Sequence, residues 1–238
     1  MKTDPVYELN EAFCEGANGI PEQPGEYARY IPAHQKERSV YPVIKRALDL
    51  VLSAAALVCL FPFLLIVAVC IRMDSEGPAL YSQMRAGKNG KPFRMYKFRS
   101  MCKDADEKLG ELRDLNEKDG PVFKMAKDPR VTRVGRVIRK YSVDELPQLI
   151  NIFLGDMSVV GPRPPLLTEV EQYTPHQRGR LGVKPGLTCY WQISGRSDLT
   201  FDRWVAMDLQ YIAERSLRTD IKIILKTVPA ALFGKGAY

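Results

Sequence analysis

Two adjacent carboxylates, Asp144 and Glu145, stand at the head of an apolar run with helical spacing. Ser142 and Glu145 have the separation of a capping box, so we expect a helix that begins close to Asp144. Both carboxylates would then lie at the positive end of the helix dipole, which keeps them ionised, as a nucleophile or a metal ligand requires. Taken alone, the same pattern is also typical of a helix cap with two solvated acids.

A turn-forming segment with an arginine follows the carboxylate pair. Residues 157–165 are rich in turn formers, and Arg163 stands between two prolines. Proline stiffens the backbone, while a planar guanidinium group matches the oxygens of a phosphate. Lys184 and Arg196 occupy similar Pro/Gly turns beside aromatic residues. Several cationic turns around one acidic pair indicate phosphate chemistry at a metal ion.

The elements that must position these residues begin with a long uncharged segment, residues 50–71. As a straight helix it would reach about 33 Å, enough to cross the hydrocarbon core of a bilayer. Pro62 interrupts the segment, and basic residues flank both ends, which favours a cytoplasmic position for each end. We therefore predict a re-entrant hairpin over residues 41–73. A buried core helix and a single membrane-crossing helix are the alternatives.

A basic, β-prone segment follows the apolar one. Residues 77–100 contain Asn89-Gly90, which is a strong hairpin signal. Residues 85–103 include seven basic side chains and no acidic one. Lys97 and Arg99 either reach inward to phosphate oxygens or belong to a solvated basic face near anionic lipid headgroups.

The remaining segments predict helices and one loose extension. Residues 104–119 are highly charged and predict a solvated amphipathic helix, whereas residues 201–238 predict two helices on the core or at a membrane interface. Arginines recur every third residue from Arg130 to Arg139, so we expect a helix with a basic ridge and Arg139 nearest the carboxylates. Residues 1–40 are polar and rich in Gly, Pro and Glu, which is typical of a loosely ordered extension.

Charge and composition narrow the class of partner. The 35 Lys and Arg outnumber the 28 Asp and Glu, so an anionic partner is expected: nucleic acid, anionic lipid or a phosphorylated substrate. The sequence lacks zinc-finger, RNP and helix-turn-helix signatures, which argues against nucleic acid. Five scattered cysteines and two histidines offer no metal-ligand spacing, so a His-rich or Cys-rich metal site is excluded.

In their order along the chain, these motifs resemble the bacterial sugar transferases, a family of monotopic polyprenyl-phosphate phosphoglycosyl transferases. The resemblance covers about residues 41–238, and the chain looks like the short form of the family. It includes the Pro-broken apolar segment and the following motifs: Lys45-Arg46-Ala47-Leu48-Asp49, Tyr96-Lys97-Phe98-Arg99-Ser100-Met101, Asp144-Glu145-Leu146-Pro147-Gln148-Leu149, Gly155-Asp156-Met157-Ser158, Gly161-Pro162-Arg163-Pro164 and Lys184-Pro185-Gly186.

The resemblance implies a reaction and a set of roles. Family members transfer a sugar 1-phosphate from a UDP-sugar to a polyprenyl phosphate and release UMP. By that pattern Asp144 is the nucleophile that forms a covalent phospho-sugar enzyme, and Glu145 helps to hold Mg²⁺. The substrate-binding residues would be those that face phosphate oxygens or the nucleotide: Lys97, Arg99, Arg139, Arg163, Lys184 and Arg196.

The sequence thus predicts an α+β, mostly helical fold: a cytosolic catalytic domain over residues 74–238, with surface amphipathic helices, on a Pro-broken re-entrant membrane helix. The expected substrates are a UDP-hexose, galactose or glucose, and undecaprenyl phosphate, at the cytosolic face of a bacterial inner membrane. A homodimer is compatible with the sequence, which does not determine the oligomeric state. The rival functions are a non-catalytic, membrane-anchored basic interaction module, and hydrolysis of a phosphoester or nucleotide sugar without a lipid acceptor.

Overall fold

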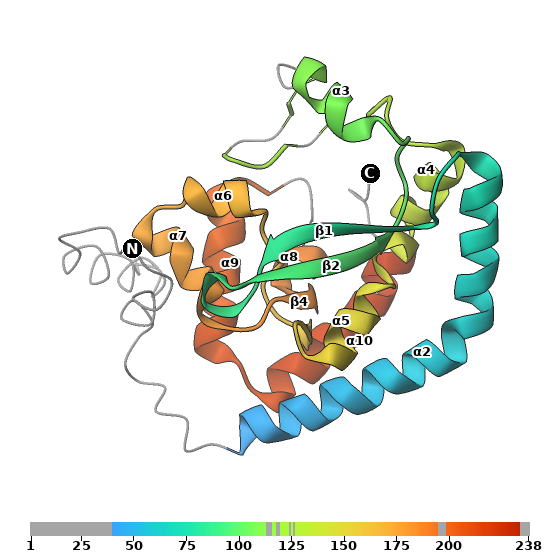
Figure 1. Cartoon of the computed structure of the whole chain (residues 1–238). Helices are drawn as coiled ribbons and strands as arrows, with labels where there is room; N and C mark the ends of the chain where they lie inside the picture. Colours follow the sequence, from blue (N-terminus) through green and yellow to red (C-terminus); the bar gives the residue numbers. More distant parts are fainter. Residues whose placement is uncertain are drawn as a thin grey trace.

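The protein is described by a computed structural model that covers residues 40–112, 116–117, 120–123, 125, 127–194 and 199–233. The predicted extension, apart from its last residue, and Arg196 lie outside these residues. The described chain is mostly helical with two small sheets, which confirms the α+β class (Figure 1). Its elements are α2 (Tyr41–Asp74), β1 (Leu80–Ala86), η2 (Lys88–Gly90), β2 (Pro92–Phe98), α3 (Ala105–Leu112), α4 (Arg133–Lys140), η4 (Val143–Glu145), α5 (Gln148–Leu154), β3 (Ser158–Val160), α6 (Leu167–Glu171), α7 (Pro175–Arg178), η5 (Gly179–Gly182), β4 (Gly186–Thr188), α8 (Tyr190–Ile193), α9 (Phe201–Glu214) and α10 (Leu217–Phe233).

The apolar segment forms one long helix, α2, that frames two sides of the molecule (Figure 1). It continues through Pro62, so the segment is bent rather than broken into two helices. Proline removes one backbone hydrogen bond and crowds the preceding turn, which favours such a bend. Only 11% of its most apolar 18-residue window is buried, with a mean hydropathy of 2.9. The exposed apolar surface contradicts a buried core helix, and the helix is long and apolar enough to be a membrane anchor.

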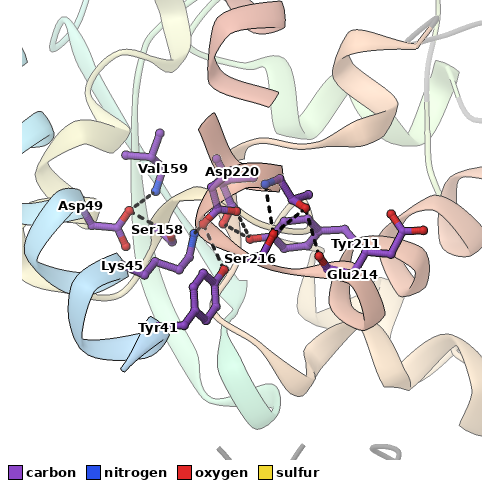
Figure 2. A network of polar contacts seen from close by, with 11 residues as sticks. Tyr41, Lys45, Asp49, Ser158, Val159, Tyr211, Glu214, Ser216 and Asp220 are labelled. Carbon is purple, nitrogen blue, oxygen red and sulfur yellow. Dashed lines mark hydrogen bonds and ion pairs between the residues drawn. The ribbon is translucent and has the colours of Figure 1, made fainter. Parts of the chain in front are cut away.

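The first turns of α2 are bound to the rest of the fold by a network of polar contacts (Figure 2). The Tyr41 hydroxyl and the Lys45 ammonium group donate to the Asp220 carboxylate on α10, at 3.0 Å and 2.7 Å. Asp49 is buried and accepts hydrogen bonds from the Ser158 hydroxyl, at 3.0 Å, and from the Val159 amide, at 2.9 Å. The start of α2 is therefore fastened to both α10 and β3.

The far end of α2 contacts the same folded body. The Asp74 carboxylate accepts a hydrogen bond from the Val134 amide at the start of α4, at 2.9 Å. Arg99, at the end of β2, donates to the carbonyl groups of Ser75, at 2.7 Å, and Glu76. Arg99 thus holds the two residues that directly follow α2.

The predicted hairpin is confirmed: β1 and β2 pair antiparallel, with Ala86 opposite Pro92 and Asn89 in the left-handed conformation within the turn. Asn151 holds this hairpin against α5. Its side-chain oxygen accepts from the Tyr96 amide at 3.0 Å, and its nitrogen donates to the Arg94 carbonyl at 2.7 Å. A core cluster of apolar residues fills the space between β2 and α5: Phe93, Met95, Leu149, Ile152 and Met157.

Two predicted helix boundaries were wrong. Asp144 and Glu145 belong to the 3₁₀ turn η4, and α5 begins only after Pro147. Ser142 adopts a left-handed conformation without a side-chain cap, so the expected capping box does not form. Pro147 has no N–H for an intrahelical bond, which favours a helix that starts behind it. The arginine helix α4 begins at Arg133; Arg130 lies before it, buried against the Asp128 carboxylate at 2.7 Å.

The short parallel pair β3–β4 holds the loop that contains Arg163. The Gly161 amide donates to the Thr188 carbonyl at 3.0 Å, and the Gly186 amide donates to the Pro162 carbonyl at 2.8 Å. The two chains approach so closely that a Cβ atom on Gly186 would lie 2.0 Å from the Gly161 nitrogen. Only glycine is compatible with this backbone contact.

We expect Gly186→Ala to lower the free energy of unfolding by about 1–3 kcal/mol, because the added methyl group must push two backbones apart. The displacement also moves Arg163, so activity should fall. Gly110→Ala in α3 is the matched control, because a Cβ there meets nothing within 4 Å and alanine favours a helix. Chemical denaturation of the detergent-solubilised protein measures both. Equal stability of the two variants would contradict the close contact.

Candidate active site

Glu145 is the centre of a buried ionic cluster formed by four separate elements. Its Oε1 accepts from the Lys97 ammonium group on β2 at 2.9 Å and from the Arg163 guanidinium group at 2.8 Å. Its Oε2 lies 3.5 Å from the side-chain nitrogen of Gln192 on α8. Glu145 itself is 9% exposed. The carboxylate therefore orients two cations toward one place, with little competition from water.

Asp144, next in the chain, is in a different state. Within the described part of the chain, its carboxylate forms no hydrogen bond and no ion pair. Burial raises the pKa of Asp144 to about 6, although the charge of Lys97 counteracts this effect. An unpaired, partly desolvated carboxylate beside cations is suited to nucleophilic attack on a phosphorus atom.

The pKa values of the two neighbouring carboxyls are shifted in opposite directions. Burial disfavours the charged form of Glu145, but the charges of Lys97 and Arg163 outweigh it and hold the pKa of Glu145 well below its usual range. Burial lowers the pKa of Lys97, and the charge of Glu145 only partly restores it. Glu145 is therefore a permanent anion that organises the cations, whereas Asp144 titrates near neutral pH.

This difference predicts the pH dependence of the reaction. Asp144 can attack only when ionised, so we expect kcat/KM to fall about tenfold per pH unit below pH 6 and to level off above it. Glu145 stays ionised over this range because its pKa is lowered. The measurement is a pH–rate profile from pH 4.5 to 8, with circular dichroism to show that the fold persists. A flat profile to pH 4.5 would contradict the assignment.

Arg85 and Gln192 are site residues that sequence reasoning did not single out. The Arg85 guanidinium group donates to the Pro164 carbonyl at 3.2 Å and so supports the loop of Arg163. Burial, followed by the charge of Arg163, lowers the pKa of Arg85 to about 10. The concentration of basic residues on the hairpin was a signal for Arg85. The sequence contains no signal for Gln192, because its contact with Glu145 depends on the placement of α8.

The structure brings together only part of the predicted set. The cluster around Glu145 contains four of the predicted residues: Lys97, Asp144, Glu145 and Arg163. The positive charge of Arg139 acts on the pKa of Asp144. Two other candidates lie elsewhere: Arg99 is at the end of α2, and Lys184 is beside Arg46 near its start. Arg196 is outside the described residues, so its predicted role stays a prediction.

The donor set fits a magnesium ion that the substrate completes, rather than a closed protein site. The described residues include no group of three or more His, Cys, Asp or Glu that could hold a metal ion. Magnesium ions are commonly bound through one or two carboxylates together with waters and substrate phosphates. Asp144 and the Oε2 atom of Glu145, which pairs with no cation in the described part of the chain, could provide those carboxylate oxygens.

Comparison with known proteins identifies the class. Residues 40–234 match the family described as bacterial sugar transferase. This match spans most of the chain, so the chain belongs to that family, and the prediction of a transferase enzyme is confirmed.

Curated relatives are similar over most of this chain. ExoY of Rhizobium meliloti, an exopolysaccharide production protein, is 41% identical over 84% of this chain and 91% of its own length. The undecaprenyl-phosphate galactose phosphotransferase of Salmonella typhimurium is 44% identical over 82% of this chain. The galactosyl transferase CpsE of Streptococcus agalactiae is 52% identical over 70% of this chain. The chain spans only 42% and 37% of the last two relatives, respectively.

Proposed function

We propose that the protein transfers a sugar 1-phosphate from a UDP-sugar to undecaprenyl phosphate through a covalent intermediate on Asp144. The observation that carries this proposal is the contrast at positions 144 and 145: an unpaired carboxylate beside one that holds two cations. Two similar proteins are named as undecaprenyl-phosphate galactose phosphotransferase and undecaprenyl-phosphate glucose phosphotransferase. Their names support undecaprenyl phosphate as the acceptor and a hexose as the sugar.

Two displacements at one phosphorus atom make up the proposed reaction. Asp144 attacks the β-phosphorus of the donor, the bond to the oxygen that bridges the two phosphates breaks, and UMP leaves. An oxygen of the lipid phosphate then attacks the same phosphorus and releases Asp144, which yields a lipid diphosphate sugar. The two steps allow a soluble donor and a membrane-bound acceptor to react in turn.

The cations of the site have separate tasks in this scheme. Lys97 and Arg163, held by Glu145, bind oxygens of the donor diphosphate, and Arg139, whose charge lowers the pKa of Asp144, is a candidate for the lipid phosphate. Asp144 and Glu145 would hold Mg²⁺, which when bound neutralises charge on the diphosphate.

The arrangement of α2 supports a site at the membrane surface. Because both ends of α2 contact one folded body, we propose that the helix enters and leaves the same leaflet. The catalytic domain would then lie on the cytosolic face of the inner membrane. On α10, Ile221, Leu225 and Val228 are exposed at helical spacing and would rest against the same surface. The phosphate of the acceptor lies at this level.

The test uses detergent-solubilised protein with Mg²⁺, undecaprenyl phosphate and a panel of UDP-sugars, with UMP release as the readout and Asp144→Ala as the control. Release that requires both the lipid and Asp144 supports the proposal and identifies the sugar. Release without lipid would indicate hydrolysis. No release from folded protein with any sugar would overturn the proposal in favour of a membrane-anchored binding module.

A further inference from the structure

A second group of cations lies apart from the catalytic cluster. The Lys184 ammonium group and the Arg46 guanidinium group both approach Gly155, where an added Cβ would lie 3.6 Å from the first and 3.2 Å from the second. Burial lowers the pKa of Lys184, and the positive charges of Arg46 and Lys88 lower it further. Arg46 on α2 and Lys184 just before β4 thus place two positive charges a short distance apart, and the positive charge of Lys88 on η2 acts on the same ammonium group.

The nearby carboxylates already have other partners. Asp49 accepts from the Ser158 hydroxyl and the Val159 amide, and Asp156 lies 3.4 Å from the side-chain nitrogen of Asn151. The charges of Asp49 and Asp156 raise the pKa of Lys184, but they do not offset burial and the charges of Arg46 and Lys88. No ion pair to Arg46, Lys88 or Lys184 occurs among the described residues. Three cations against two nearby carboxylates leave an excess of positive charge.

Apolar side chains adjoin these cations. Arg46 donates to the carbonyl groups of Ile152 and Phe153 at the end of α5, at 2.7 Å and 2.8 Å. Phe153 is 43% exposed and Leu154, the next residue, is 62% exposed. Arg46 also belongs to α2, whose next turns are apolar and exposed. Cations beside exposed apolar side chains are typical of a surface that meets the headgroup region of a bilayer.

We propose that Arg46, Lys88 and Lys184 bind the phosphate of an anionic phospholipid headgroup. The inference rests on the proposed function only in placing α2 in a bilayer. A bound headgroup would neutralise the excess charge and hold the start of α2 at the membrane surface. Asp49 connects that same part of α2 to β3, which leads directly into the loop of Arg163, so headgroup binding would also steady the active site.

The test compares two double variants of the full chain in detergent. Lys88→Gln with Lys184→Gln removes two charges from the group and leaves Arg46, which caps α5, in place. Lys103→Gln with Lys108→Gln is the matched control, because both lysines are exposed near α3, far from the start of α2 (Figure 1). Dioctanoyl phosphatidylglycerol and dioctanoyl phosphatidylcholine are titrated, and the thermal unfolding midpoint reports binding.

We expect wild type and control to bind phosphatidylglycerol more tightly than phosphatidylcholine, and the Lys88/Lys184 variant to bind phosphatidylglycerol about 30-fold more weakly. Equal affinities in all three proteins would overturn the proposal. A parallel titration with UDP separates the sources of phosphate. Weaker UDP binding in the Lys88/Lys184 variant, with phosphatidylglycerol binding unchanged, would return Lys184 to the nucleotide site. None of these titrations requires turnover, so they can fail while the proposed transfer reaction stands.

Discussion

Asp144→Asn is expected to abolish sugar-phosphate transfer, by at least about a thousandfold in kcat, and to leave the protein folded. Asparagine has nearly the same shape but cannot form the acyl phosphate. The wild type, mixed with donor and no lipid, should gain the mass of a sugar phosphate by intact mass spectrometry. Hydroxylamine, which cleaves acyl phosphates, should remove this mass. Asp144→Asn should show no mass gain. An adduct that survives in the variant would place the nucleophile elsewhere.

The same substitution should stabilise the fold. The unfolded pKa is near 3.8, and burial raises the folded pKa of Asp144 to about 6. Between these values the folded state keeps the proton, so the free energy of unfolding falls as the pH rises through this window. At pH 7.5 the Asp144→Asn substitution removes the cost of keeping a buried carboxyl ionised. We therefore expect the free energy of unfolding to rise by roughly 1–3 kcal/mol. Below pH 4 the gain should vanish. Chemical denaturation at both pH values measures the difference; a destabilised variant at pH 7.5 would contradict it.

Glu145→Ala is expected to cost both activity and stability. The substitution leaves the partly buried charges of Lys97 and Arg163 without their shared anion, which destabilises a fold by at most about 3–5 kcal/mol. The loss of stability should be largest above pH 4.5 and should shrink in acid. The lowered pKa of Glu145 stabilises the fold only at pH values where this carboxyl would be ionised in the unfolded chain. Urea denaturation at pH 7.5 gives the magnitude, and UMP release gives the loss of activity.

A second substitution separates the two roles of this carboxylate. Glu145→Gln with Lys97→Met removes one charge of each sign but leaves Arg163 without its carboxylate, so part of the stability lost in Glu145→Ala should return. Activity should not return, since the phosphate-binding arrangement is still missing. If the double variant regained transfer, Glu145 would serve only to neutralise Lys97. If it stayed as unstable as Glu145→Ala, the stabilising role of the ion pair would be wrong.

Much of this protein was readable from local patterns. The uncharged length of residues 50–71 predicted α2, and Asn89-Gly90 predicted the hairpin, because both depend on periodicity and turn chemistry within a short stretch. The Asp-Glu pair with its ordered Pro/Gly/Arg motifs predicted the family, which the match over residues 40–234 confirms. Helix starts were less predictable, since Pro147 moved the start of α5 behind the carboxylates.

Only the tertiary structure decided which basic residue does what. From the sequence, Lys97 and Arg99 were candidates for phosphate oxygens, and Lys184 was a candidate for the nucleotide end. Packing of β2 against η4 brings Lys97 to Glu145, whereas Arg99, two residues on, satisfies carbonyl groups at the end of α2, and Lys184 joins Arg46. A charged side chain takes the partner that lies within a few ångströms of it, and the partners of Lys97 and Arg99 are 48 and 23 residues away in the chain. The sequence by itself determined the elements and the chemistry available, while the packing of distant segments determined where that chemistry is assembled.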